Sequence, residues 1–149
     1  KGTTFYLKFP HEHEFDHLPE MIQLDNYCWE NKLILVAEDK KINYEIIKET
    51  LVVTDAELLW AKNGQEALDI IQNRNDIDLI LMDIQMPVMD GYETTKRIRE
   101  FNKDITIIAQ TAYALPKDNL KCFDVGCDDY IAKPISLNDF LKKLNKYLS

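Results

Sequence analysis

Residues 78–92 have the sequence Asp-Leu-Ile-Leu-Met-Asp-Ile-Gln-Met-Pro-Val-Met-Asp-Gly-Tyr, in which a short apolar run is followed by an aspartate and a loop. The apolar run Leu79–Met82 has the length of a strand that is buried on both faces. Asp83 follows it directly, and Pro87 and the Asp90-Gly91 pair then indicate a loop that leads into a helix. Asp83 is therefore expected at the carboxyl end of a buried strand, where open α/β sheets bind their ligands. Taken alone, Asp83 is equally compatible with a turn or a helix cap.

The composition of the chain excludes several classes of protein. Its 149 residues suffice for one domain with a proper core, and 46% hydrophobic residues exclude a wholly disordered chain. The formal net charge of -8 argues against general binding to nucleic acid or anionic membranes, but it is compatible with a cation site. No apolar run approaches transmembrane length, and no signal peptide is visible. Cys28, Cys122 and Cys127 form no Cys-x-x-Cys pair, which favours reduced thiols in the cytoplasm.

Short apolar strands alternate with helical patterns from Leu33 onward. Strands are predicted at residues 33–37, 56–60, 78–82, 105–110 and 129–132. This alternation predicts an α/β fold, in which a doubly wound parallel sheet of five strands carries helices on both faces. Gln110 departs from the apolar pattern, because it is a polar residue inside the fourth predicted strand.

The helical segments show apolar stripes and recognisable ends. Tyr92–Phe101 is predicted as the third helix, Pro116 fits the first turn of the fourth helix, and Gly126 closes it. Ser136 is expected to cap the last helix. The apolar stripe of the first helix is expected to comprise Ile42, Ile46, Ile47 and Leu51, and that of the last helix Leu137, Phe140, Leu141, Leu144 and Leu148.

Polar residues follow four of the predicted strands at the point where each strand ends. These residues are Glu38 and Asp39 after the first strand, Asp83 after the third, Thr111 after the fourth and Lys133 after the fifth. Three carboxylates brought together repel one another unless a cation lies among them, and oxygen ligands of this kind suit Mg²⁺. A carboxylate nucleophile, a hard cation, a lysine and a hydroxyl are the groups needed to accept a phosphoryl group. Each residue alone is better explained by a turn, a helix cap or a surface ion pair, so the prediction depends on their occurrence together at four strand ends.

Four segments of the chain match one known family. They are Leu35-Val-Ala-Glu-Asp39, Leu81-Met-Asp-Ile-Gln-Met-Pro-Val-Met-Asp-Gly91, Thr111-Ala112 and Asp129-Tyr-Ile-Ala-Lys-Pro134. On these segments, residues 32–149 resemble a two-component response-regulator receiver domain. The resemblance covers all of the predicted globular part, and it implies a flavodoxin-like (βα)5 fold with strand order 2-1-3-4-5.

The resemblance implies a role for each residue of the acidic group. Asp83 would accept phosphate from the phosphohistidine of a histidine kinase. Asp39, Asp83 and the backbone carbonyl of Gln85 would ligate Mg²⁺ directly, and Glu38 would act through water. The chain would then be a phosphorylation-dependent signalling switch. It would catalyse only its own phosphorylation and dephosphorylation.

The resemblance also assigns residues around the phosphoryl group. Thr111 and Lys133 would bind its oxygens, and Tyr130 would be a switch aromatic that turns inward when Thr111 is drawn to the phosphate. The Lys133–Pro134 bond would be cis, although only about 5–6% of bonds to proline are cis in folded proteins. Gln85 and Tyr113 would flank the attacking water and set the rate of autodephosphorylation.

The segment before the receiver domain has a different pattern. Residues 1–10 alternate apolar and polar side chains and resemble the last strand of a histidine-kinase ATP-binding domain. Residues 11–31 show little periodicity and are interpreted as a linker, and their histidines His11, His13 and His17 lack a rigid frame for a metal. The chain begins with Lys1, so we expect a receiver taken from a hybrid sensor histidine kinase whose parent chain is a candidate for membrane anchoring.

This setting suggests the partners. A histidine kinase domain, in the same chain or another, is the expected donor, and a histidine phosphotransfer protein is the expected acceptor. No output domain follows Ser149, which disfavours a DNA-binding regulator. The signal is expected to leave through the fourth helix, the fifth strand and the fifth helix, around Tyr130, Lys117 and Lys121, and this face is also a candidate for homodimer formation. No direct contact with a membrane is expected.

Other functions fit the sequence less well. A phosphatase of the haloacid-dehalogenase type needs a second aspartate two residues after the nucleophile, where this chain has Gln85. An FMN carrier would have Ser, Thr and Gly after its first strand, whereas Glu38 and Asp39 would repel phosphate. The remaining alternatives are a stand-alone receiver and a receiver domain used only for docking to a partner protein, without phosphoryl turnover.

Overall fold

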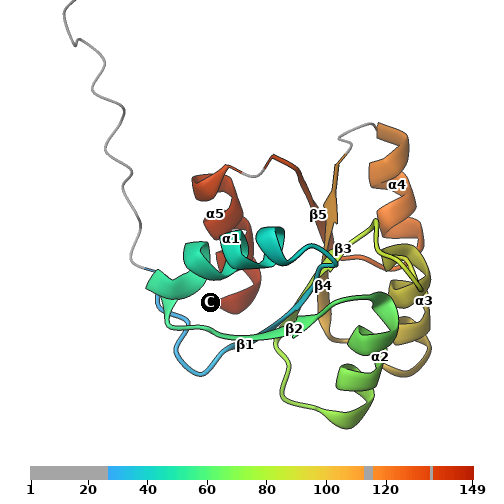
Figure 1. Ribbon diagram of the computed structural model, residues 1–149, viewed down its shortest axis with the longest axis horizontal. Helices are drawn as coiled ribbons and strands as arrows, with labels where there is room; N and C mark the ends of the chain where they lie inside the picture. The colour runs from blue at the N-terminus through green and yellow to red at the C-terminus, as the bar shows by residue number, and fades with distance from the viewer. Residues whose placement is uncertain (1–26, 113–115, 135) are drawn as a thin grey trace, which may run out of the picture.

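The computed structural model describes residues 27–112, 116–134 and 136–149, and within them five parallel strands form one sheet in the order β2-β1-β3-β4-β5 (Figure 1). The strands are β1 (Leu33–Ala37), β2 (Glu57–Ala61), β3 (Leu79–Asp83), β4 (Thr106–Thr111) and β5 (Asp129–Ala132). The predicted fold class and strand order are therefore confirmed.

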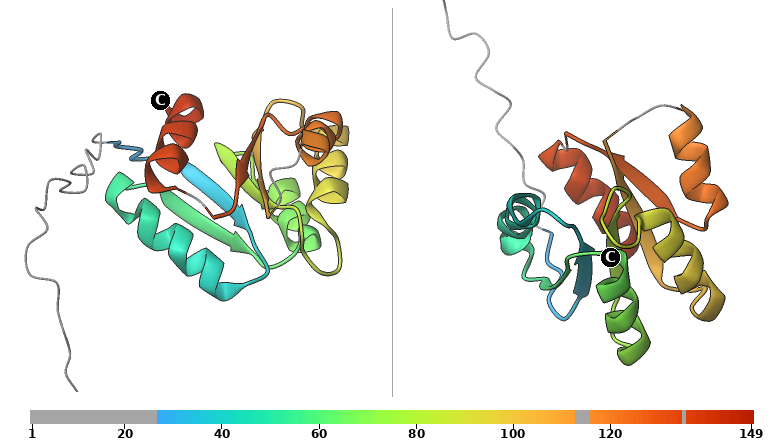
Figure 2. Two further views of the ribbon diagram at one scale, coloured as in Figure 1. Left: turned by 90° about the horizontal axis from the view of Figure 1, so that it is seen from above. Right: turned by 45° about the vertical axis from the view of Figure 1, so that its right-hand side comes forward.

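Two layers of helices cover the sheet. The helices are α1 (Lys41–Leu51), α2 (Gly64–Asn73), α3 (Gly91–Phe101), α4 (Pro116–Asp124) and α5 (Leu137–Leu148), and the short 3-10 helix η1 (Val52–Thr54) follows α1. α1 and α5 lie on one face of the sheet, and α2, α3 and α4 lie on the other (Figures 1 and 2). None of the helices in the described part of the chain is long and apolar enough to span a bilayer.

The strands are buried on both faces because their side chains alternate between the two layers. Ile34, Val36 and Leu81 belong to the core under α1 and α5, whereas Leu35 and Met82 belong to the core under α2, α3 and α4. All five residues are fully buried. This alternation also decides which way polar residues near the strand ends point.

Three strands begin and end one residue later than the sequence predicted. β3 is the informative case, because Asp78 lies outside the strand and its carboxylate accepts a hydrogen bond from the Leu33 backbone N–H at 2.8 Å. Asp83 is consequently the last residue of β3 and pairs with Gln110 of β4. β2 and β4 are displaced in the same way, and α3 begins at Gly91 instead of Tyr92.

The interpretation of residues 11–31 as a linker is wrong at its end. Trp29 is 2% exposed, its indole N–H donates to Asn145 of α5 at 3.2 Å, and its backbone N–H donates to the carbonyl of Thr54. Trp29 therefore packs against the domain, although its neighbours Cys28, Glu30 and Asn31 are exposed. Residues 1–10 and the three histidines lie outside the described residues.

The predicted stripe of α1 is only half correct. Ile47 and Leu51 are buried under the helix, but Ile42 and Ile46 are 66% and 59% exposed. Helical spacing brings the four side chains to neighbouring positions, yet α5 and the sheet cover only two of them. Ser136 occupies the predicted N-cap position of α5, but its side chain accepts no capping hydrogen bond. Its backbone carbonyl accepts the N–H of Phe140.

Candidate functional site

The predicted polar residues meet at the carboxyl edge of the sheet. Glu38 follows β1, Asp83 ends β3, and Thr111 ends β4, next to Ala132 of β5 in the sheet register. Parallel strands bring their carboxyl ends to one edge, so these positions converge although they are far apart in sequence. The strand ends thus form a small acidic pocket.

Lys133 holds the pocket together. Its Nζ donates to Oδ2 of Asp83 at 2.7 Å and to Oε2 of Glu38 at 2.8 Å. Its backbone N–H donates to the carbonyl of Thr111 at 2.7 Å, and the predicted cis bond to Pro134 is present. The lysine side chain is only 23% exposed, so both ion pairs lie in a partly water-excluded site.

The loop after β3 orients the Asp83 carboxylate. Its Oδ1 accepts the backbone N–H of Gln85 at 2.9 Å, while the Gln85 side chain is exposed. α3 begins very close to this loop, and the Gly91 N–H donates to the carbonyl of Ile84 at 3.0 Å. A side chain at Gly91 would collide with the Asp83 carbonyl, which explains the glycine at this position.

Two residues that sequence reasoning missed support Glu38, which is fully buried. The Asn43 Nδ2 of α1 donates to Oε1 of Glu38 at 2.8 Å. The indole N–H of Trp60 donates to the Glu38 carbonyl at 2.8 Å, and its ring stacks on Tyr44 with centroids 4.6 Å apart. Asn43 was detectable in principle as a polar residue in the first turn of the helix after the acidic pair, whereas the Trp60 contact depends on the register of β2.

Burial and charge act against each other in this pocket. Burial, with a further contribution from the Glu38 charge, raises the pKa of Asp83, although the hydrogen bonds from Lys133 and Gln85 oppose this. Burial would also raise the pKa of Glu38, but the hydrogen bonds from Lys133 and Asn43 outweigh it, and the pKa is lowered. Burial alone would lower the pKa of Lys133, and its two carboxylate partners reverse this and raise it. The lysine therefore remains charged.

The carboxylates are arranged as ligands for a cation. Glu38, Asp39 and Asp83 each offer one oxygen atom, and these oxygens lie within 4.8 Å of one another. The Oδ1 of Asp39 is buried and has no hydrogen-bond partner among the described residues. A buried carboxylate oxygen without a donor is costly, so the residues present fit a hard divalent cation with oxygen ligands.

The remaining predicted residues lie around this centre. Thr111 is 5% exposed at the end of β4. Tyr130 is half-buried between α4 and α5. Its ring forms a T-shaped pair with Phe123, with the ring centroids 6.0 Å apart, and its centroid lies 5.2 Å from Nζ of Lys143. Tyr113 lies outside the described residues.

The fold is a doubly wound α/β domain with an acidic site at the carboxyl edge of its sheet, and several known proteins are similar to it. The model of the response regulator receiver domain family matches residues 34–145. The chain is 35% identical over 119 residues to the polar-differentiation response regulator DivK of Brucella anthropi, across 78% of this chain and 96% of that protein. It is 40% identical over 121 residues to hybrid signal transduction histidine kinase L of Dictyostelium discoideum, across 76% of this chain and 7% of that protein.

Two solved structures are similar over most of the chain. One contains the receiver domain of Ssk1 with the histidine phosphotransfer signaling protein Ypd1 of Saccharomyces cerevisiae, with a TM-score of 0.75, 34% identity and coverage of 80% and 90%. The other is the receiver domain of sensor histidine kinase PA1611 of Pseudomonas aeruginosa with a coordinated magnesium ion, with a TM-score of 0.73, 32% identity and coverage of 79% and 98%. The chain belongs to the response regulator receiver domain family and is a signalling module of two-component phosphorelays.

Proposed function

We propose that Asp83 is the phosphoacceptor of this receiver domain. The observation that carries the proposal is the contact of its carboxylate with Lys133 at 2.7 Å, inside a cluster that also contains Glu38 and Asp39. In the transfer, a carboxylate oxygen of Asp83 attacks the phosphorus of a phosphohistidine. The phosphorus–nitrogen bond breaks, and the imidazole nitrogen keeps the electron pair and takes up a proton.

The same pocket would hold Mg²⁺. Asp39, Asp83 and the Gln85 carbonyl would ligate it directly and Glu38 through water, and the bound ion would neutralise charge on the phosphoryl oxygens. The buried, unpaired Oδ1 of Asp39 supports this assignment, as does the magnesium ion in the related PA1611 receiver domain. Lys133 would supply a fixed positive charge to the phosphoryl group, and Thr111 a hydroxyl donor.

The parent protein is proposed to be a cytoplasmic hybrid sensor histidine kinase, which is a candidate for membrane anchoring. Residues 1–10 would end its ATP-binding domain, residues 11–26 would form the linker, and residues 27–149, which include the packed Trp29, would form the receiver. Similarity to a hybrid kinase and to a kinase receiver domain supports this arrangement. A kinase domain would donate the phosphoryl group, and a histidine phosphotransfer protein would accept it, as the complex of Ypd1 with a receiver suggests.

The output is proposed to pass through Thr111 and Tyr130 to the face formed by α4, β5 and α5, which is also the candidate homodimer face. Tyr130 is half-buried against Phe123 and packs beside Lys143, so a rotation would change contacts on both helices. Tyr130→Ala should therefore leave phosphorylation intact and weaken the downstream response. Loss of phosphate uptake in that variant would contradict this division of labour. Gln85 and Tyr113 are proposed to tune dephosphorylation.

Intact-mass measurement after incubation with acetyl phosphate tests the proposed chemistry. We expect a Mg²⁺-dependent phosphate adduct on the unchanged chain and none on Asp83→Asn. An adduct that survives in Asp83→Asn would identify another nucleophile. If no adduct forms although calorimetry shows Mg²⁺ binding, the chain is a docking module without phosphoryl turnover.

A further inference from the structure

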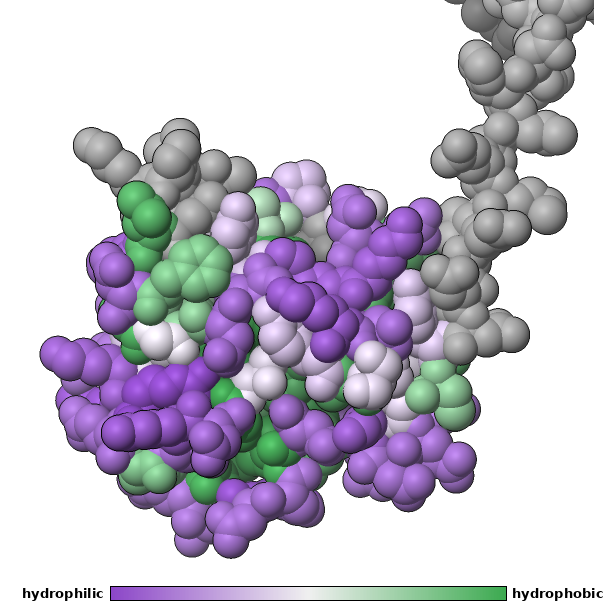
Figure 3. Space-filling model, turned by 180° about the vertical axis from the view of Figure 1, so that it is seen from behind, coloured by the Kyte–Doolittle hydropathy of each residue, from purple (hydrophilic) through white to green (hydrophobic). Residues whose placement is uncertain are grey.

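α1 carries an apolar surface that the described part of the fold leaves uncovered. Ile42 and Ile46, at 66% and 59%, are among the most exposed large apolar side chains of the described residues, and Val53 of the following turn is 58% exposed. Exposed apolar side chains gathered in one place indicate a binding surface. By contrast, the face seen from behind is mostly hydrophilic, with apolar side chains gathered mainly at one corner (Figure 3).

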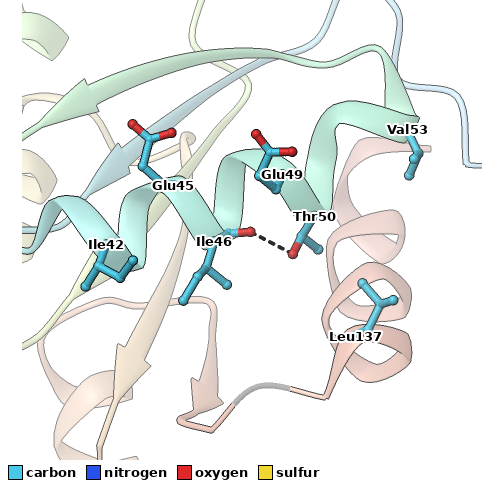
Figure 4. A pocket seen from close by; sticks show the side chains of 7 residues that line it. All are labelled: Ile42, Glu45, Ile46, Glu49, Thr50, Val53 and Leu137. Atoms are coloured by element: carbon cyan, nitrogen blue, oxygen red, sulfur yellow. Dashed lines mark hydrogen bonds between the residues drawn. The ribbon is translucent and has the colours of Figure 1, made fainter.

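These side chains line a groove of about 540 Å³ between α1 and the start of α5. Figure 4 shows Ile42, Ile46 and Leu137 on its apolar side, while Glu45 and Glu49 project from the opposite side of α1. The floor of the groove is therefore apolar. Because burying an unpaired charge is costly, a segment that fills the groove needs apolar side chains and little charge.

A second pocket, of about 350 Å³, adjoins the groove at Ile46, but its lining is partly polar. The lining includes Lys133 and Gln110, and the Gln110 side chain is 0% exposed, with no hydrogen-bond partner for its Nε2 or Oε1 among the described residues. An apolar side chain placed there would leave this amide unpaired, which costs free energy. An apolar segment is therefore expected to follow α1 along the groove and not to turn into this pocket.

The first described residues lie beside the last turn of α1. The Trp29 N–H donates to the carbonyl of Thr54 at 2.6 Å, and the Trp29 ring lies in the same core as Leu51 of α1. Tyr27 packs against this core, with its ring centroid 5.7 Å from that of Trp29. The residues that precede Tyr27 in the sequence are thus joined to the fold at the Val53 end of the groove.

The sequence before Tyr27 has the composition that the groove needs. Residues 18–24, Leu-Pro-Glu-Met-Ile-Gln-Leu, contain four large apolar side chains and one charge. Residues 11–17, by contrast, contain one apolar side chain, Phe15, and otherwise only histidine, glutamate and aspartate. The apolar residues are therefore concentrated in the part of the linker that is closer to the groove along the chain.

The lengths allow residues 18–24 to reach along the groove. α1 has 11 residues and is roughly 16 Å long. An extended chain covers about 3.3 Å per residue, so Ile22, five residues before Tyr27, can reach roughly 16 Å, and Leu18 can reach farther. Because the segment is tethered beside the groove, its effective concentration there is high, and a few apolar contacts suffice for binding.

We propose that residues 18–24 bind along the groove of their own chain and cover Ile42, Ile46 and Val53. Docking orders the segment, and the entropy lost offsets most of the free energy gained from a few apolar contacts, so the docked and undocked forms have similar populations. The segment is then a reversible cover of α1, which any protein that binds these side chains must displace. The proposal does not depend on phosphorylation of Asp83.

A spin label in the segment tests the docking in the full chain. Glu20→Cys carries the label in a Cys28→Ser background, because Cys28 is exposed whereas the other two native cysteines are buried. The isoleucine δ1 methyl signals are compared with the label oxidised and reduced. We expect the oxidised label to abolish the Ile42 and Ile46 signals, reduction to restore them, and Ile70 of α2, on the other face of the sheet, to be unaffected.

Variants separate docking from the tether, which keeps the label near α1 in any case. Ile22→Asp in the segment and Ile46→Glu in the groove should each restore the Ile42 signal in the presence of the oxidised label. Gln23→Asp is the matched control, because it adds the same charge as Ile22→Asp and removes no apolar side chain. The loss of the Ile42 signal should persist in this control.

The other outcomes would overturn the proposal. An equal loss at Ile42 in the unchanged segment, Ile22→Asp and Gln23→Asp would show that the tether alone brings the label near. No loss at Ile42 and Ile46 would refute docking and leave the groove to a separate protein. In a mixture of spin-labelled chain with isotope-labelled chain that carries no spin label, loss of the same signals would mean that the segment binds a second copy and would refute binding within one chain.

Discussion

α1 and α5 lie on the same face of the sheet, but they use their apolar residues differently (Figure 1). α5 buries four of them, Phe140, Leu141, Leu144 and Leu148, whereas α1 buries only Ile47 and Leu51 and leaves Ile42 and Ile46 exposed. Burial of apolar area is the main source of stability. The difference indicates that α5 contributes more than α1 to the stability of the fold.

The polar contacts of the two helices follow the same division. α5 is bound to the edge of the sheet, where Lys143 donates to Asp129 at 2.6 Å and the Tyr147 hydroxyl to the same carboxylate at 3.1 Å. α1 is bound to the acidic pocket, where Asn43 contacts Glu38. Changes in the ligands or charge of the pocket should therefore affect α1 more directly than α5.

The largest expected effect is on the α5 side. Phe140→Ala should lower the free energy of unfolding by about 3–5 kcal/mol, because it removes a fully buried ring and leaves a cavity. Ile46→Ala on α1 should change it by less than about 0.5 kcal/mol. Urea unfolding followed by tryptophan fluorescence measures both values, and similar losses in the two variants would contradict the division between the helices.

Binding of Mg²⁺ should stabilise the α1 side selectively. At about 100 times the Kd, the ion should add about 2.7 kcal/mol to the free energy of unfolding, since only the folded chain presents the site. Hydrogen exchange should show greater protection over residues 38–48 than over residues 137–148. Asp39→Asn removes the carboxylate that carries the unpaired Oδ1 and should abolish most of this gain in stability. Equal protection of both helices would refute the selective effect of Mg²⁺ on α1.

Loss of the Gln110 amide should increase stability. Gln110→Met keeps the length of the side chain and removes an unpaired buried amide, so we expect a gain of about 1 kcal/mol. The midpoint of urea unfolding measures this gain. A loss of more than about 1 kcal/mol would instead mean that ordered water already pairs the amide in the free chain.

These residues also show what sequence can and cannot predict. The positions of Asp83 and Lys133 at the carboxyl ends of their strands were predictable within one residue, because the topology of a parallel sheet brings strand ends together. The exposure of Ile46 was not, because periodicity shows which residues share a face and not what covers that face. The Trp60 contact with Glu38 and the lack of a hydrogen-bond partner for the Gln110 amide among the described residues depend on strand register and side-chain packing, which single-residue patterns do not contain.

The smallest expected effect is the pH dependence of the contact between α5 and Asp129 of β5. Burial alone would raise the pKa of Asp129, but the hydrogen bond from Lys143 and the other donors outweigh it and lower the pKa. A carboxyl whose pKa is lower in the folded state contributes stability above its unfolded pKa of about 3.9, and this contribution is lost as the pH falls through the folded value. Acid should therefore weaken the attachment of α5 to β5.

Asp129→Asn tests this with thermal unfolding between about pH 6 and pH 3. We expect a loss of about 1 kcal/mol or less near pH 6, because the Lys143 partner is partly exposed, and a smaller difference from the unchanged chain as the pH falls toward 3. Glu49→Gln, on the exposed side of α1, controls for the removal of one negative charge. If Asp129→Asn and the unchanged chain differed by the same amount at every pH, the contribution of Asp129 would come from packing, and the ionic anchor of α5 would be refuted.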